Sequence, residues 1–265
     1  MAKVTQSLVA HNSKYIVMPP HKEGQEGWGN LTEPDVYVLD TGQEYPIGTK
    51  FVDGDRTFHY GYMYSDTAGA DRGGIGCGDL NEKSSPTTSA VIEPIGETEI
   101  SIVDASSTLH QYAGGMFWPY IAPYYISYRV VGNTATSSGA VVITLERGLL
   151  QATTESVALN ELYANQYTKL NTCWVNGDYS TSCMGIALPT PVAERYMWLL
   201  TWGPCIVAGG DGVPGSEAGY RGVWINIDGT TIDGAGGRGQ RIGHIINDTG
   251  ATYTNSNFIH VQITP

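Results

Sequence analysis

Short stretches in which apolar and polar residues alternate recur along most of this chain of 265 residues. Such alternation predicts β-strands, because successive side chains of a strand point to opposite faces of a sheet. The clearest pair of strands covers residues 124–131 and 140–145, joined by a turn over 132–139. Its apolar residues fall on one face of each strand: Tyr124, Ile126 and Tyr128, then Val141, Ile143 and Leu145.

Other segments with similar patterns predict further strands, and these cover residues 36–39, 50–52, 56–60, 97–103, 183–188, 196–202, 221–227, 241–246 and 258–263. Asp53-Gly54 lies between two of them and predicts a two-residue type I′ hairpin turn, whose central residues both need positive φ. One short helix is predicted over 156–164, because Val157, Leu159 and Leu162 lie at helical spacing.

Many short strands separated by turn residues predict an all-β fold, either an antiparallel β-sandwich or a barrel, with a small N-terminal β lobe and long loops. Residues 1–34 show little periodicity and are predicted to be an extended arm. Residues 35–95 are predicted to form the small lobe, in which 61–95 is a long loop rich in Gly, Ser and Asp. Residues 96–265 are predicted to form the main sandwich or barrel.

Composition supports the all-β prediction. The chain has 34 Gly, 13 Pro and 17 Tyr, but only 15% of its residues are charged. Amphipathic helices draw on the Glu and Lys that are scarce here, whereas Tyr, Trp, Thr, Val and Ile favour strands. The formal net charge of −12 repels phosphate backbones, so no nucleic-acid partner is expected.

Two features of the sequence concern its location. No apolar run approaches the roughly 18 residues that a membrane helix needs, so no membrane partner is expected. The N-terminus shows neither the charged start nor the apolar run of a secretory signal, which indicates synthesis in a reducing cytoplasm. The four cysteines, none in a CxxC pair, are then expected to be free buried thiols, with a Cys173–Cys183 disulfide left open: Cys77, Cys173, Cys183 and Cys205.

Motifs that could carry chemistry have simpler explanations here. Residues 234–239 match GxGxxG, but the residues that follow are typical of a strand rather than of the helix that binds a pyrophosphate. Five aspartates beside glycines fit tight turns better than a calcium loop, and the six histidines form no metal-ligand spacing. We therefore assign no catalytic, cofactor-binding or metal-ligating residue and expect that the chain is not an enzyme.

Dense clusters of aromatic residues are the candidate functional residues. Aromatic side chains bury large areas at small entropic cost, so they either fill a core or anchor a partner. A core role is the simpler interpretation, and a subunit interface or a sugar-stacking surface is the alternative. The candidates for a partner interface are Phe117, Trp118, Tyr120, Tyr124, Tyr196, Trp198 and Trp202.

The aromatic strand at residues 196–204 ends in Trp-Gly-Pro and is preceded by Gly185-Ile186-Ala187-Leu188. This stretch and Ile242-Gly243-His244 are the two stronger of several short motifs. The others are Tyr45-Pro46-Ile47-Gly48-Thr49, Arg56-Thr57-Phe58-His59-Tyr60, Tyr112-Ala113-Gly114-Gly115 and Val142-Ile143-Thr144-Leu145-Glu146. Together these motifs resemble a family of virion structural proteins from tailed bacteriophages, which are encoded with the major capsid protein and decorate the capsid.

This resemblance covers about two thirds of the chain, and none of its motifs is catalytic. It implies a decoration or cement protein on the capsid surface of a virion, made in the host cytoplasm. The implied partners are the major capsid protein and further copies of the chain, with a homotrimer favoured. The leading alternative is a carbohydrate-binding adhesin or receptor-binding module of a phage tail or fibre. A third class, a depolymerase, would need paired carboxylates in a cleft.

Overall fold

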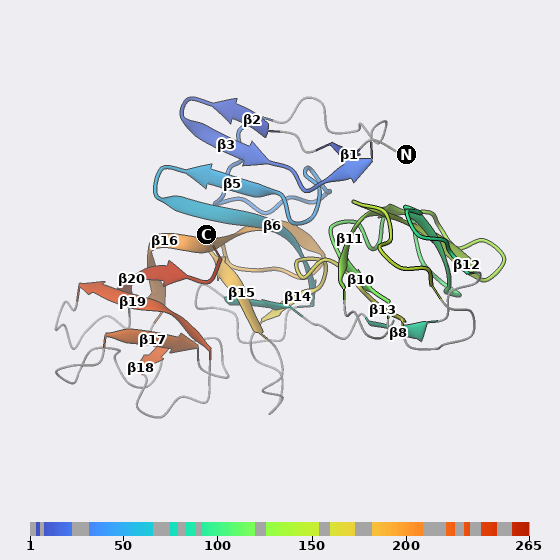
Figure 1. Ribbon diagram of the computed structural model, residues 1–265. Coiled ribbons are helices and arrows are strands. Elements are labelled where there is room, and N and C mark those ends of the chain that lie inside the picture. Colours follow the sequence, from blue (N-terminus) through green and yellow to red (C-terminus); the bar gives the residue numbers. More distant parts are fainter. Residues whose placement is uncertain are drawn as a thin grey trace. The chain divides into compact units, whose positions relative to one another are not determined.

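A computed structural model describes most of the chain as strands and turns (Figure 1), with no helix among the described residues. That part of the chain accordingly contains no helix long and apolar enough to span a bilayer. The described residues are 4–5, 8–22, 32–65, 75–78, 83–87, 92–119, 126–153, 160–172, 182–208, 221–225, 231–233, 240–247 and 256–264.

The chain divides into two compact units, and each unit is assembled from separated segments. Unit 1 consists of Met1–Leu8, Val17–Asn30 and Leu80–Gln166. Unit 2 consists of Val9–Ile16, Leu31–Asp79 and Tyr167–Pro265. The division therefore differs from the consecutive lobes predicted with a boundary at residue 95, because segments far apart in the sequence pair with each other in each unit.

Unit 1 contains a two-stranded sheet, β1-β4, and a six-stranded antiparallel sheet in the order β8-β13-β10-β11-β12-β9. Its strands are β1 (Val4–Thr5), β4 (His21–Lys22), β8 (Lys83–Thr87), β9 (Glu99–Val103), β10 (Met116–Trp118), β11 (Tyr128–Asn133), β12 (Ala140–Leu145) and β13 (Asn160–Tyr163).

The predicted strand pair is the centre of unit 1. β11 and β12 are antiparallel neighbours, and β12 pairs with β9 so that Ile143 faces Ile100 and Val141 faces Ile102. All four of these side chains are fully buried. Alternation within each strand therefore places one apolar face in a shared core, as the pattern predicts.

Unit 2 contains one twelve-stranded sheet in the order β18-β17-β19-β20-β16-β15-β7-β14-β6-β5-β3-β2. Its strands are β2 (Leu8–His11), β3 (Lys14–Val17), β5 (Lys50–Asp53), β6 (Arg56–Ser65), β7 (Ile75–Gly78), β14 (Leu170–Thr172), β15 (Ser182–Ala187), β16 (Arg195–Ala208), β17 (Gly222–Ile225), β18 (Thr231–Asp233), β19 (Arg241–Asn247) and β20 (Ser256–Gln262). β6 pairs in parallel with β14, but antiparallel with β5 and β16.

The longest strand, β16, organises unit 2. Its first half pairs with β6 from Arg195 to Trp202, and its second half pairs with β20 from Trp202 to Ala208. In the first half, Trp198 and Leu200 belong to one apolar cluster, while the alternate residues Met197 and Leu199 belong to another. A single strand thus supplies side chains to two cores, one on each of its faces.

The predicted all-β fold is confirmed, and it agrees with the sandwich alternative rather than the barrel. The twelve-stranded sheet ends in β18 and β2, and the six-stranded sheet ends in β8 and β9, so neither is closed end to end. The predicted strands near residues 50, 58, 100, 185, 198, 223, 243 and 260 are all present.

The hairpin β5-β6 is confirmed with a different turn. Asp53 pairs with Arg56, so the central residues of the turn are Gly54 and Asp55 rather than Asp53 and Gly54. Only Gly54 among them has positive φ, at 62°. Positive φ at the first central residue alone is the property of a type II′ turn, not of the predicted type I′.

The predicted N-terminal arm is wrong for residues 8–17, which form β2 and β3 and extend the sheet of unit 2. Ile16 is fully buried in the same cluster as Trp198. The signal that was missed is the turn between the two strands, where Asn12 and Ser13 both have positive φ. That conformation matches the right-handed twist of a hairpin.

Three further predictions are corrected by long-range pairing. Residues 36–39 form a turn, and only Asp40 makes an isolated bridge, with Tyr196. The predicted loop 61–95 contains the end of β6 and the strands β7 and β8. In the predicted helix, residues 160–163 form β13, whose partners β10 and β8 satisfy its backbone groups. Residues 154–159 lie outside the described residues.

Candidate functional site

The predicted interface residues fall into three groups. Phe117 and Trp198 are 0% and 1% exposed and lie in the cores of their units, so their prediction as interface residues is corrected to core packing. Trp118, Tyr196 and Trp202 are half-buried and can contribute to a surface. Tyr120 and Tyr124 lie outside the described residues.

Tyr196 belongs to an aromatic cluster that grades from core to surface. Its ring stacks on that of buried Tyr60 at 5.8 Å and contacts that of half-buried Tyr62 at 4.8 Å. Tyr60 in turn contacts Trp198 at 5.0 Å. Because the phenol rings continue the packing of the core, Tyr196 is held in place rather than free to adapt to a partner.

The carboxyl group of Asp40 is hydrogen-bonded to this aromatic cluster. The hydroxyl of Tyr60 donates a hydrogen bond to Asp40 Oδ2 at 2.7 Å, and the backbone N–H of Glu44 donates to the Tyr60 hydroxyl at 3.2 Å. Burial raises the pKa of Tyr60 and also that of Asp40. The phenol is therefore held neutral, which suits a structural hydrogen bond and not a nucleophile.

Trp202 lies where β16 leaves the core and begins to show one face to solvent. Residues 203, 205 and 207 point inward and are buried, while the alternate residues lie on an outer face. On that face, the neighbouring strands β20, β19 and β17 contribute His260, His244 and Trp224. We call Trp202, His260, His244 and Trp224 the Trp–His strip.

Three rings of the Trp–His strip contact one another, and the fourth, Trp224, contacts a guanidinium group. The imidazoles of His244 and His260 stack with ring centres 5.3 Å apart and planes 8° apart. The indole of Trp202 meets His260 edge-on, at 5.3 Å and 88°. At the other end, the guanidinium of Arg241 lies over the Trp224 ring at 5.9 Å. The result is a row of flat rings across four strands.

Apolar side chains continue the same face beyond the strip. Ile206 lies two residues after Pro204 in β16 and is 70% exposed. Phe258, the residue of β20 that pairs with Ile206, is also exposed. Ile246, two residues after His244 in β19, is also exposed. Exposed apolar residues grouped on one sheet face are typical of a contact surface.

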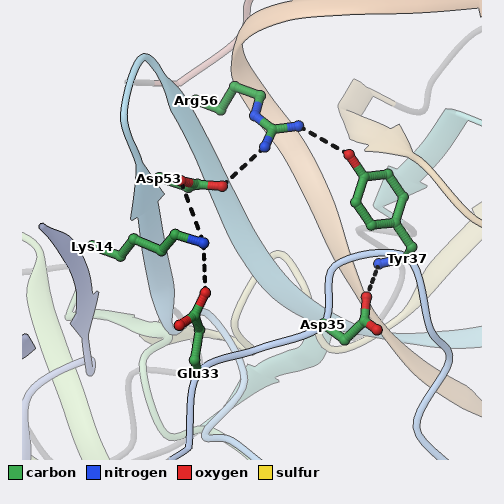
Figure 2. Close-up of polar contacts among 6 residues, drawn as sticks. All are labelled: Lys14, Glu33, Asp35, Tyr37, Asp53 and Arg56. Carbon is green, nitrogen blue, oxygen red and sulfur yellow. Dashed lines mark hydrogen bonds and ion pairs between the residues drawn. The ribbon is translucent and has the colours of Figure 1, made fainter. Parts of the chain in front are cut away.

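A second candidate is a charged hollow of about 290 Å³ in unit 2 (Figure 2). Lys14 Nζ lies 2.5 Å from Glu33 Oε1 and 3.6 Å from Asp53 Oδ1. Arg56 Nη2 lies 2.9 Å from the other oxygen of Asp53, and Arg56 Nη1 donates to the Tyr37 hydroxyl at 3.1 Å. These contacts connect the tips of two hairpins with the turn that contains Tyr37.

The charges of this hollow already have partners within the protein. The hydrogen bond to Glu33 raises the pKa of Lys14, and the charge of Asp53 acts in the same direction. Partly exposed ion pairs of this kind contribute little stability each. We therefore interpret the hollow as a clamp that positions residues 33–37 against β3 and β5, and not as a ligand site.

The other ionisable groups do not form a reactive centre among the described residues. Burial lowers the pKa of His59 to about 4 and raises the pKa of Cys183 and of Cys205 to about 12. Cys183 and Cys205 are free thiols, and Cys173, the partner that the sequence left open for Cys183, lies outside the described residues. The described residues contain no group of three or more His, Cys, Asp or Glu that could hold a metal ion.

The sequence predicted only one member of the Trp–His strip, Trp202. His260 lies 16 residues after His244 and Trp224 lies 20 residues before it, so no local motif links them. The available signal was the alternation in three C-terminal strands, each with an apolar face and an imidazole or indole on the other. Only the order of the strands shows that these positions are neighbours.

No protein-family model matches this chain, and neither a curated protein nor a solved structure is significantly similar to it.

Proposed function

We propose that this chain is a non-enzymatic structural protein of a tailed-phage virion, which binds the assembled capsid and stabilises it. The motifs listed under Sequence analysis support the virion role by resemblance. The proposed partner is the major capsid protein, and the proposed form is a homo-oligomer, with a trimer favoured. The observation that carries a contact role is the N-terminal hairpin β2-β3 at the edge of the twelve-stranded sheet.

The two faces of this hairpin differ. Val9 and Ile16 pack against the core, while Leu8 and Tyr15 are 63% and 45% exposed. β2 ends the sheet, so its outer edge pairs with no other strand among the described residues. An exposed edge strand with apolar side chains is a template on which another chain can add a strand or pack.

A protein that binds only the assembled lattice stabilises it by mass action, because the bound state is favoured over free subunits. Contacts repeated around a symmetric oligomer add up, so each contact can be small. A small hairpin with two exposed apolar side chains is sufficient for such a contact. No catalytic group is needed for it.

The test uses the full chain, phage heads that lack it, and two variants. Leu8→Glu combined with Tyr15→Glu places charges on the outer face of the hairpin, and Val192→Glu is the matched control at another exposed apolar position. We expect the wild type and the control to sediment with heads and to raise the temperature at which heads release DNA. The double variant should do neither while keeping its strand content by circular dichroism.

Two outcomes would contradict the proposal. If the wild type binds no heads, the virion role fails. If the double variant binds and protects heads as well as the control does, the hairpin is not the contact surface.

A further inference from the structure

We infer that the Trp–His strip is a saccharide-binding surface, in which sugar rings lie on the indoles of Trp202 and Trp224 and sugar hydroxyls bond to the imidazoles between them. This site is separate from the hairpin to which the capsid contact is assigned. It goes beyond the proposed function, because a capsid protein does not need it.

The register of the strands makes the strip continuous. His260 faces Pro204 of β16 on one side and His244 of β19 on the other, and His244 faces Gly222 of β17. The strip therefore crosses three inter-strand steps, a length of about 14 Å. That length fits a short oligosaccharide better than a single sugar.

Two glycines give the rings their positions. A Cβ on Gly222 would lie 2.3 Å from Trp224 Cη2, so the missing side chain is what allows the indole to fold back beside the register partner of His244. A Cβ on Gly243 would lie 2.0 Å from the carbonyl oxygen of His260. The close approach of β19 to β20 at this point is what brings the two imidazoles into stacking contact.

One polar atom of the strip is left without a partner. Nδ1 of His260 is buried and makes no hydrogen bond with any described residue. A buried polar atom without a partner destabilises the folded protein, so natural proteins seldom keep one without a reason. Here the ring orientation is set by the contacts with Trp202 and His244, and not by a hydrogen bond of this nitrogen.

Charge and chemistry together favour a saccharide. The chain carries a net charge of −12, yet none of the described outward residues of β16, β20, β19 and β17 named above is a carboxylate. Indole faces are electron-rich and attract the slightly positive C–H groups of a pyranose, while imidazoles both donate and accept hydrogen bonds.

The experiment titrates the full chain with a panel of soluble oligosaccharides, including cellohexaose, chitohexaose and a polysialic-acid fragment, and follows tryptophan fluorescence and heat of binding. Three variants probe the strip: Trp202→Ala, Trp224→Ala and Gly222→Ala. The last keeps every ring but displaces Trp224. Tyr64→Ala is the control, because Tyr64 is an exposed aromatic residue of the same unit outside the strip.

We expect at least one saccharide class to bind saturably and to change tryptophan fluorescence. Each strip variant should weaken binding by about tenfold or more, the size expected for removing one aromatic anchor, while Tyr64→Ala leaves it unchanged. The inference is overturned if no oligosaccharide of the panel binds at millimolar concentration, or if binding survives in all three strip variants.

A protein partner on the strip is a separate outcome of the same variants. If Trp202→Ala and Trp224→Ala lose binding to phage heads and the wild type binds no saccharide, the strip is a protein contact and the saccharide inference is wrong. Loss of head binding in the hairpin variant alone bears only on the proposed function, so the two failures can be told apart.

Discussion

The two halves of β16 lie in one continuous strand but in different surroundings. In the first half, residues 197–201 are all buried, because neighbouring elements cover both faces of the strand. In the second half, burial alternates: 203, 205 and 207 are buried, and 202, 204 and 206 are not. Each half contains a tryptophan, and only the second tryptophan reaches a surface.

This difference shows that aromatic density alone does not identify a contact surface. Trp198 stands in an unbroken apolar run, which is the pattern of a strand covered on both faces. Trp202 begins a segment in which small or aliphatic inward residues alternate with outward ones, which is the pattern of a strand covered on one face. The period of burial, rather than the kind of side chain, separates core from surface.

Truncating each tryptophan in turn should lower the free energy of unfolding by different amounts in the two halves. Trp198→Ala removes a fully buried ring that contacts Tyr45, Phe51 and Tyr60, and should lower the free energy of unfolding by about 3–5 kcal/mol. Trp202→Ala removes a half-buried ring and should cost about 1 kcal/mol. Denaturant unfolding of both variants measures the difference. Equal losses would mean that Trp202 is also a core residue.

The buried half should also carry a pH dependence, through a histidine of the neighbouring strand β6. Burial, aided by the charge of Lys50, lowers the pKa of His59 to about 4 from its ordinary value of 6.5. Its ring stacks on Tyr167 and is hydrogen-bonded with Thr201 of β16. Below pH 6.5 the His59 imidazole is protonated in the unfolded chain, whereas in the folded chain it stays neutral until the pH approaches 4. Stability from this residue is therefore complete above pH 6.5 and falls as pH decreases to 4.

The expected loss is up to about 3 kcal/mol between pH 6.5 and pH 4. Carboxylates also titrate in this range, so the measurement is the difference between the wild type and His59→Gln in urea unfolding at each pH. The difference should shrink as pH falls. A constant difference would show that His59 is protonated in the folded protein as readily as in the unfolded chain.

Gly203, at the junction between the halves, should be sensitive to a single methyl group. Its φ is +110°, and a Cβ would lie 2.6 Å from the carbonyl oxygen of Asp55 in the β5-β6 turn. Gly203→Ala should therefore cost about 1–3 kcal/mol. Gly42→Ala is the control, since a Cβ there meets nothing within 4 Å. Thermal unfolding distinguishes the two, and equal melting temperatures would contradict the argument.

Sequence patterns were reliable for two hairpins whose strands are adjacent in the chain, although the hairpin β2-β3 was missed. β5 and β6, and β11 and β12, were predicted because turn residues and alternation act over a few positions. The predicted helix failed at residues 160–163 because three apolar residues at helical spacing are weaker than pairing with β10 and β8. The segment 36–39 failed for a different reason: Val36 is buried, but Tyr37 and Val38 are exposed, and the segment forms a turn and not a strand.

Composition and local alternation were enough to establish an all-β chain with little charge and to place most of its strands. They could not establish which strands are neighbours, because the sequence of one strand does not indicate which distant segment pairs with it. The burial of Trp198, the packing of the N-terminal hairpin and the assembly of Trp202, His260, His244 and Trp224 into one row all depend on that pairing. A side chain's face is a local property of its strand, whereas what covers that face depends on the whole sheet.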